Sequence, residues 1–152
     1  MASFNQVNMS AFDEIERLLR HGDAQAEKIA QDMIRAGAQV LIKAQKAEIR
    51  RLAFSDRSLG TLENSIGMGN FKRGTRASST AIHTDVFPQG YHPHGFPRAR
   101  KRGRVSSAQV GFILEYGHSN MPARPWMSVA ENKAADEVID AMARVWEAAQ
   151  DG

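Results

Sequence analysis

The sequence predicts an α+β fold, in which a small antiparallel sheet of three or four strands packs with a long N-terminal helix and a C-terminal helix. Two observations lead to this prediction. Apolar residues recur every three or four positions before residue 52 and again from Pro125 onward, which is the spacing of one helix face. Short segments with strand-like residues lie between these regions. The 152 residues contain no internal repeat and are predicted to form a single domain, 1–152.

The first helical signals lie near the N-terminus. Ser10 is predicted to cap a short helix, because Asp13 and Glu14 follow it in the first turn. Gly22 is predicted to end this helix, since glycine readily adopts the left-handed backbone conformation. Asp23 then caps a longer second helix that ends before the sequence FSDRSLG. The apolar stripe of the second helix reads Ile29, Met33, Ala36, Val40, Ala44 and Ala47.

Three segments in the middle of the chain are predicted to be strands: 62–69, 78–87 and 110–116. The polar sequence FKRGTRAS between the first two contains Gly74 and predicts a hairpin loop. In the third strand, side chains alternate between two faces, so Ile113 and Glu115 are expected on the face opposite to four apolar residues. These four are Val110, Phe112, Leu114 and Tyr116.

Residues 88–108 are predicted to form a long basic loop, because they contain three prolines and three glycines. Five cations occupy a seven-residue window inside it: Arg98, Arg100, Lys101, Arg102 and Arg104. Without them, 15 basic residues face 17 acidic ones, so the net charge of +3 is a local property. The window is predicted to contact either DNA phosphates or an acidic neighbouring subunit, and a solvated loop is the third alternative.

The sequence LEYGHSNMPARPW, residues 114–126, is predicted to form a structural turn before the last helix. Gly117 permits a sharp change of direction, while Pro122 and Pro125 stiffen the path, with Pro125 at the first helical position. Trp126 is expected to wedge into the junction between sheet and helix. Glu115 and Arg124 flank the turn, and we expect them to pair. The stripe of the last helix reads Met127, Ala130, Ala134, Val138, Met142 and Val145, widened by Ile139 and Trp146.

Few residues indicate catalysis. The absence of cysteine excludes disulfides, cysteine-ligated zinc and thiol chemistry, and no serine-elbow or phosphate-loop motif is present. His92 and His94, joined by His83 or His118, would be the candidate metal ligands of a metal-dependent enzyme. Solvated loop histidines are the simpler interpretation, so we predict no metal, no cofactor and no enzymatic activity.

No signal peptide or membrane span is predicted, and a cytosolic or virion setting is expected.

Two motifs resemble a known family. One is Glu115-Tyr116-Gly117 followed by Met121-Pro122-Ala123-Arg124-Pro125-Trp126, with Ala130 in the helix beyond. The other is Gly60-Thr61-Leu62 followed by Ser65-Ile66. Both motifs, in this order, are similar to the neck or tail-completion protein family of long-tailed phages, whose members act between head closure and the tail terminator. The order of elements agrees from about residue 10 to residue 149.

The resemblance implies a structural virion protein of the phage neck that joins the DNA-filled head to the tail. It implies a ring of about six copies, with the head-closure and tail-terminator proteins as neighbours, and no membrane. The charge of the basic window adds non-specific contact with packaged DNA as a further alternative. The protein would occur in the host cytoplasm during assembly and in the virion afterwards. We favour the neighbouring subunit as the partner of the basic window, because cations crowding a channel would retard DNA passage. A non-specific nucleic-acid-binding module is the alternative function.

Overall fold

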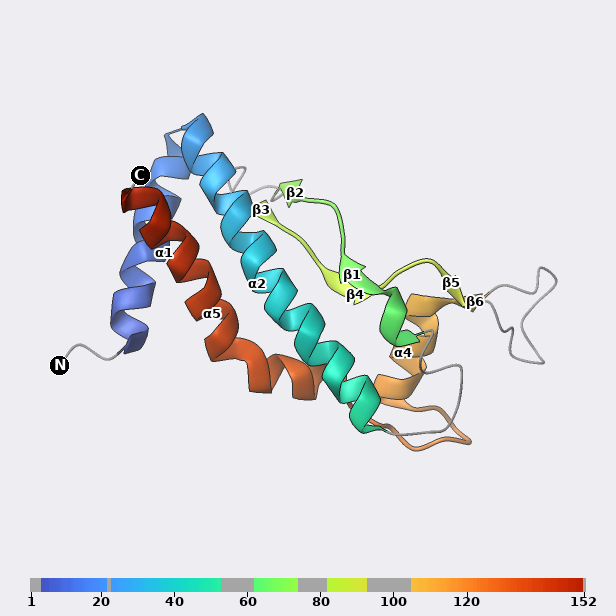
Figure 1. Cartoon of the computed structure of the whole chain (residues 1–152). Helices are drawn as coiled ribbons and strands as arrows, with labels where there is room; N and C mark the ends of the chain where they lie inside the picture. Colours follow the sequence, from blue (N-terminus) through green and yellow to red (C-terminus); the bar gives the residue numbers. More distant parts are fainter. Residues whose placement is uncertain (1–3, 22, 53–61, 74–81, 93–104, 152) are drawn as a thin grey trace. The chain divides into compact units, whose positions relative to one another are not determined.

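The computed structural model describes residues 4–21, 23–52, 62–73, 82–92 and 105–151. The elements follow in the order α1 (Phe4–Arg20), α2 (Ala24–Arg51), β1 (Ile66–Met68), β2 (Lys72–Arg73), β3 (Ile82–His83), β4 (Val86–Pro88), β5 (Tyr91–His92), β6 (Val105–Ser106), α4 (Ser107–Tyr116) and α5 (Met127–Asp151) (Figure 1). The combination of long helices with short antiparallel strands confirms the predicted α+β class. None of the helices within these ranges has both the length and the apolar character of a membrane span.

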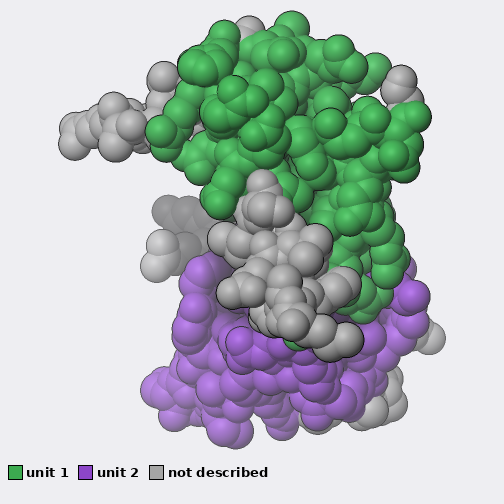
Figure 2. All heavy atoms as spheres, turned by 90° about the vertical axis from the view of Figure 1, so that its left-hand side faces the viewer, with its two compact units in different colours: residues 1–40, 69–85, 135–152 green, residues 41–68, 86–134 purple. Residues whose placement is uncertain are grey.

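The chain divides into two compact units (Figure 2). Unit 1 consists of residues 1–40, 69–85 and 135–152, and unit 2 of residues 41–68 and 86–134. α2 and α5 therefore each contribute residues to both units. Each unit has its own cluster of buried apolar side chains. Whether the two units act as the predicted single domain stays a prediction.

In unit 1, α1, the first part of α2 and the last part of α5 lie side by side (Figure 1). The buried core joins Ile15 of α1, Ala30 and Met33 of α2, and Trp146 of α5. Trp146 belongs to the predicted stripe of the last helix. Packing of these apolar faces stabilises helices that would be marginal alone in water.

The start of α2 agrees with the sequence prediction, whereas the start of α1 does not. The Asp23 carboxylate accepts hydrogen bonds from the backbone N–H groups of Gln25 at 2.9 Å and Ala26 at 3.1 Å, so it caps α2 as predicted. α1 already begins at Phe4, and Ser10 lies inside it. Serine is only mildly unfavourable within a helix, so a serine followed by acids does not by itself mark a helix start.

Unit 2 has a core made from α2, residues 62–66, α4 and the residue that precedes α5. Its buried apolar residues are Ile49, Leu62, Ile66, Val110, Leu114 and Trp126. Two antiparallel strand pairs belong to this unit. β1 pairs with β4 in the register Gly67↔Phe87, and β5 pairs with β6 in the register Tyr91↔Ser106.

The first two predicted strands are present in shortened form. Residues 62–65 form a helical turn, and the strand starts only at Ile66. β2 pairs antiparallel with β3 in unit 1, with Lys72 opposite His83, so Lys72 and Arg73 are strand residues although the sequence predicted them as part of the hairpin loop. The predicted loop residue Gly74 lies outside the described residues. Where the structure describes the chain, its strands form three two-stranded pairs.

The third predicted strand, 110–116, is wrong: the segment is the helix α4. The Ser106 hydroxyl accepts a hydrogen bond from the Gln109 N–H at 3.1 Å, and Gly117 ends the helix. Val110 and Leu114, four residues apart, form the buried face, while Phe112 and Tyr116 are exposed. The apolar alternation that predicted a strand is also compatible with two different faces of a helix, and the serine cap selects the helix.

The predicted loop 88–108 is shorter in the structure. Pro88 ends β4, Tyr91–His92 is β5, Val105–Ser106 is β6, and α4 starts at Ser107. The antiparallel pairing of β5 with β6 brings the two flanks of 93–104 next to each other. Strand pairing at both flanks satisfies backbone groups that a loop would leave to water.

Candidate functional site

The turn that carries one of the two family-like motifs connects α4 to α5. Gly117 ends α4 with a φ of 72°, and its N–H donates to the Ile113 carbonyl at 2.8 Å. A Cβ at this position would lie 2.6 Å from the Ala123 nitrogen and 2.7 Å from the Met121 oxygen. Both the backbone angle and the lack of space require glycine here, as predicted.

Beyond Gly117 the chain is held by backbone hydrogen bonds. His118 and Met121 exchange N–H···O bonds of 2.9 and 3.0 Å, and the Arg124 N–H donates to the Leu114 carbonyl at 2.7 Å. The segment therefore folds back along the end of α4. Pro122 lies within this constrained stretch, where its fixed φ lowers the entropy lost on folding.

Trp126 locks α5 onto α4. Its side chain is fully buried, and its indole Nε1–H donates to the Gly111 carbonyl at 3.0 Å. A Cβ on Gly111 would lie 2.9 Å from the Trp126 ring and 3.0 Å from Pro88, so the ring packs directly on the α4 backbone. The predicted wedge is present, but it enters a junction between two helices.

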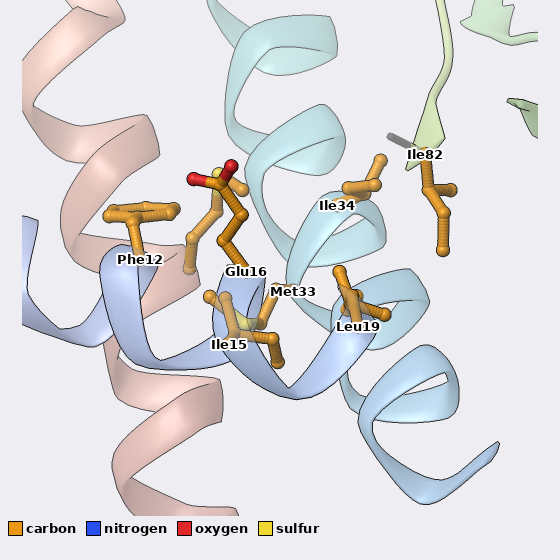
Figure 3. A pocket seen from close by; sticks show the side chains of 9 residues that line it. Phe12, Ile15, Glu16, Leu19, Met33, Ile34 and Ile82 are labelled. Atoms are coloured by element: carbon orange, nitrogen blue, oxygen red, sulfur yellow. The ribbon is translucent and has the colours of Figure 1, made fainter. Parts of the chain in front are cut away.

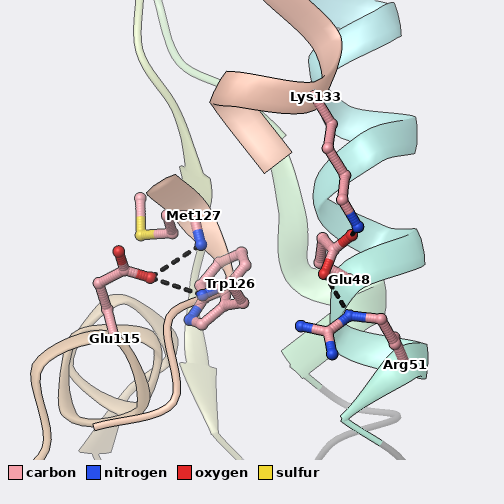
Figure 4. Close-up of polar contacts among 6 residues, drawn as sticks. All are labelled: Glu48, Arg51, Glu115, Trp126, Met127 and Lys133. Atoms are coloured by element: carbon pink, nitrogen blue, oxygen red, sulfur yellow. Dashed lines mark hydrogen bonds and ion pairs between the residues drawn. The ribbon is translucent and has the colours of Figure 1, made fainter. Parts of the chain in front are cut away.

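Glu115 caps the N-terminus of α5 (Figure 4). Its Oε2 accepts hydrogen bonds from the N–H groups of Trp126 at 2.7 Å and Met127 at 2.8 Å, and its Oε1 accepts one from the N–H of Ser128 at 3.2 Å. The residue is 7% exposed. These N–H groups have no partner within the helix, and the positive end of the helix dipole favours a carboxylate.

Burial alone would raise the pKa of the Glu115 carboxyl. Hydrogen bonds from Ser128, Trp126 and Met127 outweigh burial, and the pKa is lowered from 4.5. The carboxylate is therefore held in its charged form by the helix start. This role is not visible in the sequence, because the partners are backbone groups 11 to 13 residues further along the chain.

The predicted partner of Glu115 was Arg124, and that side-chain pairing stays a prediction.

α5 starts at Met127, and the Trp126 carbonyl accepts the hydrogen bond from the Ala130 N–H at 3.0 Å. Pro125 thus precedes the helix instead of occupying its first position. The N–H groups that Glu115 caps belong to Trp126, Met127 and Ser128, all of which follow the proline.

A second buried carboxylate lies in unit 2. Glu48 of α2 is 5% exposed and contacts Arg51 Nε at 2.6 Å and Lys133 Nζ of α5 at 2.7 Å (Figure 4). The Lys133 and Arg51 hydrogen bonds lower the pKa of the Glu48 carboxyl. The contact with Lys133 ties two helices together across 85 positions of sequence. Both buried carboxylates in the described chain therefore hold two helices together.

The predicted contact residues of the basic window lie outside the described residues. They are Arg98, Arg100, Lys101, Arg102 and Arg104. Whether they contact DNA or a neighbouring subunit stays a prediction. His94 also lies outside the described residues, and over the described ranges no group of three His, Asp or Glu side chains could hold a metal ion.

Two further surface features, one on each unit, are candidates for binding a partner. On α4, Phe112 is 57% exposed and Tyr116 is 70% exposed, and their ring centroids lie 5.3 Å apart. In unit 1, an open apolar groove of about 260 Å³ lies between α1, α2, α5 and β3 (Figure 3). The predicted strand placed Phe112 and Tyr116 on the same face as Val110 and Leu114, whereas in the helix one pair is exposed and the other is buried.

Comparison of the chain with protein-family models, with curated proteins and with solved structures found no match.

Proposed function

We propose that this protein is a structural subunit of the phage neck, which joins the DNA-filled head to the tail during tail completion. It has no enzymatic activity and needs no cofactor. It works as a ring of about six copies between the head-closure and tail-terminator proteins. It is made in the host cytoplasm and remains in the virion, with non-specific proximity to packaged DNA.

The observation that carries this proposal is the construction of the α4–α5 junction. Residues of the family-like motif each have a mechanical task there: Glu115 caps α5, Gly117 turns the chain, and Trp126 packs on α4. Because the Glu115 carboxylate and the Trp126 indole N–H are already hydrogen-bonded, the junction is suited to hold a fixed angle between α4 and α5 under mechanical load. It is poorly suited to chemistry, which needs an available acid, base or nucleophile.

Labelling of virions tests the proposal. A small tag at the C-terminus of the full chain, decorated with gold particles, should place the label at the junction between head and tail. Gold on the head shell, on the tail shaft, or on no part of the particle would contradict a neck role. A tagged major tail protein provides the positive control for labelling efficiency.

A second candidate is a non-specific nucleic-acid-binding module. One observation favours it: Tyr91, at the flank of the segment with five cations, is 65% exposed and offers a ring for stacking on bases. This candidate predicts DNA binding by the isolated protein that weakens steeply as salt rises. Changing Arg98, Arg100, Lys101, Arg102 and Arg104 to glutamine should then abolish binding, and equal binding by parent and variant would exclude the role.

A further inference from the structure

We infer that neighbouring copies associate head to tail, with the Phe112–Tyr116 pair of one copy inserted into the apolar groove of unit 1 of the next copy. This inference rests on the proposed ring and names the surfaces through which its subunits touch. Three independent observations support it: the exposed aromatic pair, the open groove, and the opposite charges of the two units.

The aromatic pair has the properties of an interface anchor. Large aromatic side chains dominate the binding energy of protein interfaces, because they bury much apolar area with few rotatable bonds. Phe112 and Tyr116 are one helical turn apart, and their rings tilt against each other at 39°. They are therefore held as one apolar projection on the solvent side of α4.

The groove has a matching size and chemistry. Eight of its nine lining residues are apolar, among them Phe12, Ile34 and Met142. Its volume of about 260 Å³ exceeds the roughly 150 Å³ that suffices to hold a benzene molecule in a protein cavity, so it has room for an aromatic side chain and part of a second. Glu16, the ninth residue, can accept a hydrogen bond from the hydroxyl of an inserted tyrosine (Figure 3).

The charges of the units favour contact between unlike units. Among the residues that the structure describes, unit 1 contains 7 Lys and Arg residues against 12 Asp and Glu residues, a net charge of −5. The described residues of unit 2 contain 6 against 4, a net charge of +2. The groove lies on the negative unit and the aromatic pair on the positive one. A symmetric contact of unit 2 with unit 2 would oppose like charges, whereas a head-to-tail contact joins opposite ones.

A head-to-tail contact leaves a free groove at one end of a pair and a free aromatic projection at the other. Further copies can therefore add until the rotation between neighbours closes a ring. The same contact explains why two hydrophobic surfaces remain open on one chain: each is covered by the other in the assembly.

Sedimentation velocity at low salt tests the anchor. The parent should self-associate, and Tyr116→Ala should weaken association about tenfold or more. Asn132→Ala is the control, because it truncates an exposed, uncharged residue of unit 2 outside the proposed contact, and it should associate as the parent does. Raising the salt concentration should weaken the parent's association. A parent that stays monomeric at every concentration, or a Tyr116→Ala variant that associates like the parent, overturns the inference.

Disulfide trapping tests which residues meet in the contact, and no native cysteine can interfere because the chain has none. A mixture of Tyr116→Cys and Glu16→Cys proteins should form a crosslinked dimer on oxidation, because the two side chains meet in the contact. Gln25→Cys, an exposed residue of unit 1 outside the groove, should not crosslink to Tyr116→Cys. Efficient crosslinking of Tyr116→Cys to itself would instead show a symmetric contact and overturn the head-to-tail arrangement.

The outcomes separate this inference from the proposed function. If gold labels the neck but Tyr116→Ala associates normally, the neck role stands and the contact is wrong. If the crosslink forms as expected but the protein is absent from particles, the contact stands and the neck role is wrong. Association of the parent only when DNA is added would assign the surfaces to a nucleic-acid complex and overturn the inference.

Discussion

The carboxylate of Glu115 accepts a hydrogen bond from the backbone N–H of Trp126 at 2.7 Å, across a turn of ten intervening residues. The last turn of α4 thereby provides the cap of α5. Trp126 returns the contact through its indole N–H, which donates to Gly111 of α4. The Glu115 carboxylate of α4 thus bonds to the start of α5, and the Trp126 indole bonds back to α4. These two hydrogen bonds together fix the angle between the helices.

Replacing Glu115 by glutamine should destabilise the protein by about 1–2 kcal/mol, because the charge facing the free N–H groups of α5 is lost while the shape is kept. Urea unfolding would measure the loss. Glu131→Gln is the matched control, since Glu131 is an exposed residue of the same helix, and it should change stability by less than about 0.5 kcal/mol. Equal losses in both variants would argue against the cap.

Acid should remove the stabilisation that Glu48 provides. Lys133 and Arg51 lower the pKa of its carboxyl in the folded chain from 4.5. Stability from a lowered carboxyl pKa is fully present above the unfolded value and is lost as the pH falls through the folded value. The stability difference between the parent and Glu48→Gln should be full near neutral pH and shrink below 4.5. A difference that grows on acidification would contradict the contact.

Gly117→Ala should destabilise the protein by about 2 kcal/mol or more, because it combines a positive φ with a steric clash. Gly90→Ala separates the two effects: its φ of 73° is nearly the same, but no atom of the described residues lies within 4 Å of the added methyl group. Thermal melts should show a clearly larger loss for Gly117→Ala. Similar losses in the two variants would mean that the turn has room to relax.

Gln45→Met should stabilise the protein by about 1 kcal/mol. Gln45 is fully buried in unit 2, and among the described residues neither its Nε2 nor its Oε1 has a hydrogen-bond partner. An unsatisfied buried amide costs free energy that a thioether of similar shape does not. Gln39→Met, at an exposed position of the same helix, should change little. A loss of stability in Gln45→Met would show that the amide does have a partner.

Features that depend on neighbouring residues in the sequence could be predicted from it. The cap at Asp23 and the glycine at position 117 were predicted because each depends on its immediate neighbours. The helix α4 was missed because alternating apolar residues favoured a strand. The pattern of Ser106 with Gln109 three residues later, a helix-capping pair, was the signal that could have found it.

The role of Glu115 could not be found in this way. Its partners are backbone N–H groups, which every non-proline residue carries, so no residue type marks them. Only the fold brings them to the carboxylate. The exposed positions of Phe112 and Tyr116 likewise depend on the segment being a helix, and the groove depends on α1, α2, α5 and β3 coming together.

Electron microscopy of particles made without this protein tests the neck role most directly. A deletion strain should yield heads filled with DNA and, beside them, separate or defective tails. Supplying the full chain from a plasmid should restore joined particles, and the Gly117→Ala variant, with its strained junction, should restore fewer. Normal infectious particles from the deletion strain would contradict the central claim, as would empty heads, which would place the protein in DNA packaging.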